Sequence, residues 1–143
     1  MYELLQKLIA FKYACKINHW STDKYSSHLL FDRLTEDIDT WVDEIAETYF
    51  MASDNKSIFK SDLLNPKLIN RNLVNSCIHI ITHLEQQQNS KELNEGLKSL
   101  LSAIEQGFLG KLALAKLIQK TRFIKRVFFT KHLKQKTPIW AFS

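Results

Sequence analysis

Apolar side chains recur every three or four residues through most of the chain, as they do along one face of an α-helix. One such face, within residues 3–20, carries Leu4, Leu8, Phe11 and Cys15. The longest face carries Phe31, Leu34, Ile38, Val42, Ile45 and Tyr49. The spacing predicts four helices, over residues 3–20, 23–51, about 67–88 and about 91–119.

Polar residues interrupt the periodic pattern between the predicted helices. Ser21, Thr22 and Asp23 supply N-cap side chains for the second helix. Residues 52–66 form a polar connector that ends at Pro66, and residues 88–90 form a brief polar break. Short links favour antiparallel neighbours. We therefore expect an all-α, antiparallel four-helix bundle with a short connector between the second and third helices.

The composition agrees with one helical domain. The chain has 143 residues, and its three Gly and two Pro are too few for a fold with many β-turns. No run of about 18 apolar residues occurs, and the N-terminus has no signal-peptide pattern. Cys15 and Cys77 are isolated and predict reduced thiols. We expect a cytoplasmic protein without a transmembrane segment.

Charge divides the chain unevenly. Residues 1–105 hold 11 basic and 15 acidic residues, a net charge of −4, whereas nine basic and no acidic residues follow Glu105. We therefore predict a helical domain over residues 1–119 and a basic C-terminal tail over residues 120–143. An acidic body with a basic end favours a polyanionic partner.

The basic tail mixes cations with aromatic side chains. Its predicted polyanion-binding residues are Lys120, Arg122, Lys125, Arg126, Lys131, Lys134 and Lys136. Contacts of this kind with nucleic acid are independent of sequence and sensitive to salt. The pattern favours non-specific DNA binding; an anionic membrane surface, a protein partner and a merely solvated end are the alternatives.

A second stripe follows the predicted second helix, with spacings of 4, 4, 3, 4 and 4. Its members are His28, Asp32, Glu36, Asp39, Asp43 and Glu47. The stripe spans about 100° of the helix surface and lies roughly 135° from the apolar stripe, so it faces sideways, away from the bundle core. Carboxylates and imidazoles together suit Fe(II), Mn or Zn. His19 would add a ligand from the first helix, and isologous pairing of two copies would supply the rest.

Other chemistry finds no support. None of the five histidines has Glu three residues before it, so the inward-facing di-iron site built from Glu-x-x-His pairs is not expected. Catalytic nucleophile arrangements, Gly-rich phosphate loops and zinc-finger spacing are also missing. His79 and His83 are four residues apart on the third helix and are interpreted as boundary residues of its apolar face.

The ligand candidates resemble the ferroxidase segment of the Dps family, the ferritin-like DNA-binding proteins of starved cells. The matching residues are Asn18-His19-Trp20, then His28-x-x-x-Asp32, then Asp43-x-x-x-Glu47. The two histidines are nine residues apart, a spacing similar to that in short phage and viral ferritin-like proteins of unassigned function. The motif covers about 30 residues, and the helical layout extends the resemblance loosely over residues 1–119.

The resemblance implies a ferritin-like bundle that oxidises Fe(II) with peroxide or dioxygen and stores iron. Its catalytic and metal-binding residues would be His19, His28, Asp32, Asp43 and Glu47, with Zn or Mn suited to the same ligands. The site would lie between two-fold-related subunits of a homo-oligomer such as a dodecameric shell. Trp20 would pack against the bundle or shield the iron. The alternative is a non-catalytic scaffold or DNA-binding structural protein of phage or viral type that uses the basic tail.

Overall fold

In a computed structural model the described part of the chain, residues 1–52 and 59–136, is helical and contains no strand. Within these ranges there are five α-helices: α1 (Tyr2–Ser21), α2 (Tyr25–Leu34), α3 (Ile38–Ile45), α4 (Leu73–Gln88) and α5 (Glu95–Lys136). A π-helical segment, η1 (Ala46–Met51), extends α3. Two 3₁₀ turns, η3 (Ser61–Leu63) and η4 (Pro66–Leu68), lie in the connector to α4. The prediction of an all-α fold is confirmed.

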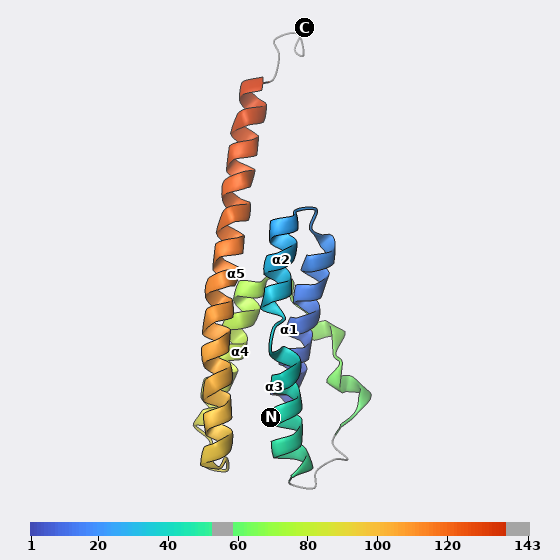
Figure 1. Cartoon of the computed structure of the whole chain (residues 1–143), viewed down its shortest axis with the longest axis vertical. Coiled ribbons are helices and arrows are strands. Elements are labelled where there is room, and N and C mark those ends of the chain that lie inside the picture. Colours follow the sequence, from blue (N-terminus) through green and yellow to red (C-terminus); the bar gives the residue numbers. More distant parts are fainter. Residues whose placement is uncertain (53–58, 137–143) are drawn as a thin grey trace.

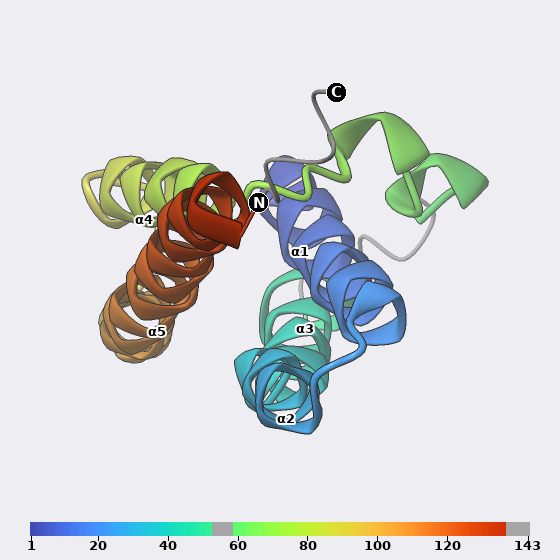
Figure 2. The same cartoon turned by 90° about the horizontal axis from the view of Figure 1, so that it is seen from above.

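The helices pack as two neighbouring pairs. α1 runs antiparallel to α2 and α3, which follow one another end to end, so that α2 covers α3 when seen from above (Figures 1 and 2). α4 and α5 form an antiparallel hairpin, and α5 continues well past the other helices. The first part of the connector, which contains η3 and η4, lies outside α1 on the side away from α5, and the chain then crosses to α4 (Figures 1 and 2).

The core lies where the two pairs meet. Phe11 of α1, Phe31 of α2 and Phe108 of α5 are almost completely buried, together with Leu4, Leu8, Leu34, Ile38, Cys77 and Leu101. The rings of Phe11 and Phe108 meet edge to face with their centroids 5.1 Å apart. Aromatic pairs of this geometry stabilise a core by about 0.5–1.5 kcal/mol beyond the area they bury.

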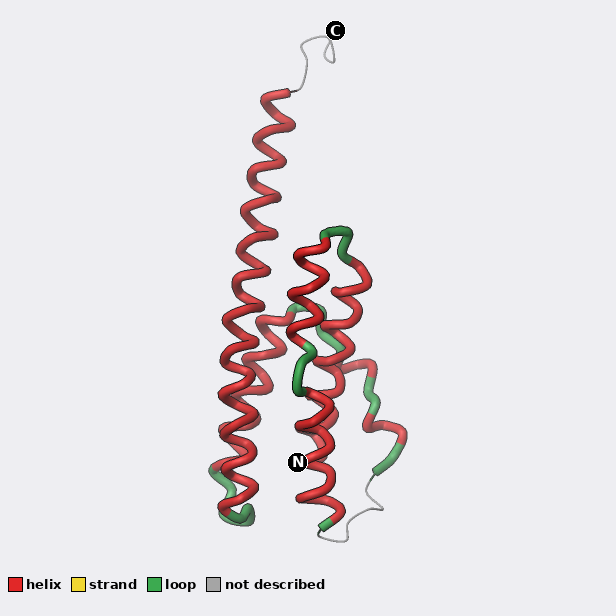
Figure 3. The backbone as a smooth tube through the Cα atoms, in the orientation of Figure 1, coloured by secondary structure: helices red, strands yellow, loops and turns green. Residues whose placement is uncertain are grey.

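The prediction of one helix over residues 23–51 is wrong, because the helix is broken at residues 35–37 (Figure 3). Thr35 turns back on α2, with its hydroxyl donating to the carbonyl of Asp32 at 2.6 Å. Asp37 then takes the left-handed conformation, with φ of 68°, which Asp tolerates better than most residues. The ammonium of Lys111 donates to the carbonyls of Leu34 and Glu36 at 2.9 and 2.8 Å. These bonds satisfy carbonyl groups that the break would otherwise leave unpaired.

The third and fourth helices also differ from their predicted limits. α4 begins at Leu73 rather than near residue 67, because Asn72 caps it by accepting from the backbone N–H of Asn75 at 3.1 Å. α5 runs through residue 119 without a break, so the predicted tail is in part the end of the fourth long helix. No Gly or Pro stands between Lys111 and Thr137 to end it.

Cys15 and Cys77 are free and buried in the core. Burial raises the pKa of each thiol to about 12. Both cysteines are therefore inert packing residues, as the prediction of reduced thiols requires.

Two glycines of α5 differ in their surroundings and make a matched pair. A Cβ at Gly107 would clash with the Trp41 ring, whereas a Cβ at Gly110 would meet no atom within 4 Å. We expect Gly107→Ala to destabilise the protein by about 1–3 kcal/mol through overpacking. Gly110→Ala should stabilise it by up to about 1 kcal/mol through helix propensity. Urea unfolding of both variants measures the difference, and equal midpoints would contradict the close packing of α5 against Trp41.

Candidate metal centre

His19 and His28 lie face to face at the turn between α1 and α2. Their ring centroids are 3.4 Å apart and their planes differ by 28°. The Nδ1 atom of His19 is 2.8 Å from the carbonyl oxygen of His28, and the Nδ1 atom of His28 is 3.1 Å from the carbonyl oxygen of His19. The chain reversal over residues 22–24 thus holds both rings through reciprocal bonds.

These bonds determine the tautomer of each ring. A carbonyl oxygen only accepts, so each Nδ1 must carry the proton that it donates. In the neutral ring the Nε2 atom then has a free lone pair, and neither Nε2 is hydrogen-bonded to a described residue. Metal-binding histidines are commonly fixed in this way, with the second ring nitrogen donating to a backbone carbonyl.

Within one chain, the acidic residues predicted as metal ligands do not form a cluster with the histidine pair. Asp32, one turn along α2 from His28, pairs with Lys16 of α1 at 3.4 Å. Asp43 on α3 and Glu47 on η1 follow the break and are exposed, with no ion pair to a described residue. Among residues 1–52 and 59–131, no three His, Cys, Asp or Glu side chains come close enough to hold a metal ion.

The two remaining members of the stripe, Glu36 and Asp39, are in contact with lysines of α1 and α5. Asp39 receives two hydrogen bonds from the ammonium of Lys12, at 2.8 and 2.9 Å. Glu36 is exposed in the break, and its carbonyl accepts from Lys111. Both residues therefore belong to the packing of α1 and α5 against the broken helix.

Exposed apolar residues surround the histidine pair in the sequence. Trp20, next to His19, is 68% exposed and therefore does not pack against its own chain as one reading of the sequence expected. Tyr25 and Leu29 lie one turn apart on α2 and are also exposed. Exposed aromatic side chains are enriched at protein interfaces. The periodicity used to find core residues could not identify this surface, because these positions fall outside the apolar stripe.

His79 and His83 behave differently from the first pair. His83 is buried, and its Nδ1 lies 2.9 Å from the ammonium of Lys7. Burial lowers the pKa of His83, with a further contribution from the charge of Lys7. His79 is exposed. The interpretation of these residues as boundary positions of the helix face agrees with their placement.

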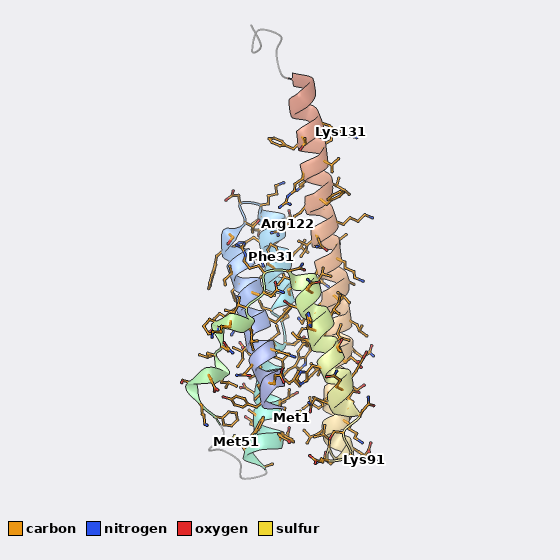
Figure 4. The ribbon with its side chains drawn as sticks, turned by 180° about the vertical axis from the view of Figure 1, so that it is seen from behind. Met1, Phe31, Met51, Lys91, Arg122 and Lys131 are labelled. Carbon is orange, nitrogen blue, oxygen red and sulfur yellow. The ribbon has the colours of Figure 1, made fainter. Side chains whose placement is uncertain are left out.

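The far end of α5 carries the predicted polyanion-binding residues. Lys120, Arg122, Lys125, Arg126 and Lys131 are all exposed, whereas the side chains of Lys134 and Lys136 lie outside the described residues. The neighbouring Lys125 side chain lowers the pKa of Lys24 in the α1–α2 turn, because two ammonium groups that lie close together disfavour each other's charge. In Figure 4 Lys131 lies far from Lys91, at the opposite end of the molecule.

Comparison of the chain with protein-family models, with curated protein sequences and with solved structures finds no match. The Dps resemblance therefore rests on the motif residues alone and stays a prediction. No helix among the described residues has an apolar stretch long enough to cross a bilayer.

Proposed function

We propose that this protein binds Fe(II) as a substrate and oxidises it at a site formed between two copies of the chain. The observation that carries the proposal is the pair of histidines with their Nδ1 atoms on backbone carbonyls. Two Nε2 lone pairs on stacked rings form a ready-made part of a nitrogen and oxygen ligand set. Each ring would offer its Nε2 atom while its Nδ1 atom stays bonded to a backbone carbonyl.

The remaining ligands would come from a second subunit. Asp43 and Glu47 are exposed and unpaired with respect to described cations, so their carboxylates are available to another chain. Trp20, Tyr25 and Leu29 give the histidine end an apolar surface that a second copy would cover. In an isologous dimer each chain then contributes histidines to one site and carboxylates to the other. Such dimers would assemble further into a closed shell whose subunits are ferritin-like four-helix bundles. The shell would store the ferric product.

In this reaction the role of the protein is to bind Fe(II) and to hold it in place for the oxidant. Carboxylates bind both Fe(II) and Fe(III), and imidazole fixes the geometry. Each Fe(II) gives one electron, and one peroxide accepts two electrons and two protons to become two waters. Zn or Mn would occupy the same ligands without this reaction. Asp32 would join the set after exchanging its ion pair with Lys16.

The proposal predicts that the full-length protein oxidises Fe(II) faster than buffer does. Anaerobic protein is mixed with Fe(II) and then with a limiting amount of peroxide, and near-UV absorbance follows the ferric product. We expect His28→Gln to slow the reaction by about tenfold to a hundredfold, the range found when a residue supporting a metal site is lost.

The matched control is His79→Gln, which removes an exposed histidine from α4. It should leave the rate unchanged. A wild-type rate equal to that of protein-free buffer would refute iron oxidation. Equal rates for the two variants would show that the histidine pair is not the site.

A second candidate function is DNA binding through the end of α5. Its supporting observation is the exposed segment 120–131, which has five cations, no acid and the exposed apolar residues Phe123, Ile124, Phe128 and Phe129. The adjacent ammonium groups of Lys24 and Lys125 repel one another, and a phosphate between them would relieve that repulsion. The α5 part of this surface lies apart from Asp43 and Glu47, whereas Lys24 lies in the turn between His19 and His28. Both functions occur together in the family that the motif resembles.

A further inference from the structure

A cavity of about 360 Å³ lies where the start of α4 meets α1, α2 and α5. The side chains of three arginines line it: Arg71, just before α4, and Arg122 and Arg126, one turn apart on α5. No Asp or Glu lines this cavity, and no described carboxylate forms an ion pair with any of the three. The cavity is thus a concentrated positive site that the chain itself does not neutralise.

The cations are held close together despite their repulsion. The guanidinium of Arg122 lies over the Phe31 ring, 4.8 Å from its centroid. Figure 4 labels both residues, which lie near one another. Burial lowers the pKa of Arg122, and the charges of Arg71 and Arg126 lower it further. Three guanidinium groups gathered around one cavity are a common means of binding phosphate, since each offers paired donors.

Asn18 adds an uncharged polar side chain to the cavity. Its side chain is 2% exposed and lines the same cavity. The amide nitrogen donates to the carbonyls of Ala14 and Arg71 at 2.9 and 3.3 Å. Among the described residues no buried side-chain nitrogen or oxygen atom lacks a hydrogen-bond partner, so this amide belongs to the polar lining of the cavity. The start of α4, at Leu73, also lines the cavity and adds the positive end of its dipole.

The rest of the cavity wall is apolar. Phe31, Leu73, Ala115, Ile118 and Phe123 face it. Its volume lies in the range of small-molecule sites, about 300–1,000 Å³. Inorganic phosphate would accept hydrogen bonds from the arginines but would leave the apolar wall in contact with water. A phosphate ester with an aromatic group would bind the arginines and also cover the apolar wall.

We propose that this cavity binds a small organic phosphate, with the phosphate on Arg71, Arg122 and Arg126 and an aromatic group against Phe31 and Phe123. The site is separate from the histidine pair and does not depend on iron oxidation. It also differs from the DNA-binding surface, because it requires Arg71, which precedes α4.

The test is calorimetric titration of the full-length protein with phenyl phosphate, inorganic phosphate and phenol. Phenyl phosphate should bind about tenfold more tightly than inorganic phosphate, because its ring leaves water. Phenol should not bind measurably. Arg71→Gln and Arg126→Gln should each weaken phenyl phosphate binding by about tenfold or more, the effect of losing a hydrogen bond to a charged group.

The control is Arg33→Gln, which removes an exposed arginine of α2 that does not line the cavity. It should leave phenyl phosphate affinity unchanged. Equal affinities for phenyl phosphate and inorganic phosphate would overturn the proposal, since they would indicate a cluster of surface cations only. Unchanged binding in Arg71→Gln, or no binding of phenyl phosphate at millimolar concentration, would overturn it as well.

Discussion

Replacing Lys111 should destabilise the protein more than any other single loss of a lysine. Lys111 is 8% exposed, and its ammonium donates to the carbonyls of Leu34 and Glu36 while lying 5.4 Å from the centre of the Trp41 ring. Lys111→Ala leaves both carbonyls without their donor and opens a cavity beneath α5. An unsatisfied buried polar group costs about 1–3 kcal/mol. We therefore expect a loss of about 3–5 kcal/mol in the free energy of unfolding, measured by urea denaturation.

Two further variants separate the causes. Lys111→Met keeps most of the stem and removes only the ammonium, so its cost should be smaller, about 1–3 kcal/mol. Lys116→Ala removes an exposed lysine from the same helix and should change stability by about 0.5 kcal/mol or less. A Lys111→Ala protein as stable as Lys116→Ala would contradict the account of how the α2–α3 break is held.

Removal of residues 120–143 should abolish binding to duplex DNA while leaving iron oxidation intact. The deletion removes seven of the chain's 20 basic residues and leaves the proposed iron ligands, which all precede residue 48, untouched. For the full-length protein, five to seven phosphate contacts predict a slope of about −4 to −6 in log K against log salt. Gel-shift titrations over a range of salt concentrations measure both quantities.

Truncation removes part of α5 as well as its charges. Two full-length variants that each lose three lysines separate the effect of charge from that of the missing segment. Changing Lys120, Lys125 and Lys131 together to Gln should reduce the salt slope by about three. The same change at Lys91, Lys98 and Lys116, away from the end of α5, should have little effect. No DNA shift at low salt would end the nucleic-acid hypothesis. Binding that survives the first triple change would place the contact elsewhere.

Local patterns predicted the helices but not where they stop. The stripes that contain Phe11 and Phe31 identified buried faces correctly, because a 3.6-residue period reflects burial directly. The break at Asp37 has no Gly or Pro to announce it. It depends on Lys111, 75 residues from Glu36, whose carbonyl it binds. Such a long-range contact cannot be read from the residues near the break.

The candidate site was partly predictable for a similar reason. His19 and His28 were chosen by motif, and the turn between α1 and α2 brings them together. Spacing alone could not show that each Nδ1 would meet the other residue's carbonyl. The acidic stripe assumed one unbroken helix, so the division of Asp32 from Asp43 was not foreseen. Arg122 and Arg126 were predicted only as part of a basic tail, and Arg71 was not singled out, since nothing in the sequence relates Arg71 to Arg122.

The most direct test of the shared site is complementation between two impaired chains. His28→Gln and Asp43→Asn chains are produced separately and also co-expressed with different tags, and the mixed oligomer is purified through both tags. Each mixed pair has one intact site of two, with histidines from one chain and carboxylates from the other. Each variant alone should oxidise Fe(II) with peroxide about tenfold or more slowly than the wild type. The doubly purified oligomer should recover about half of the wild-type rate per chain. No recovery in verified mixed oligomers, together with Fe(II) oxidation by wild-type monomers, would contradict a site formed between two copies.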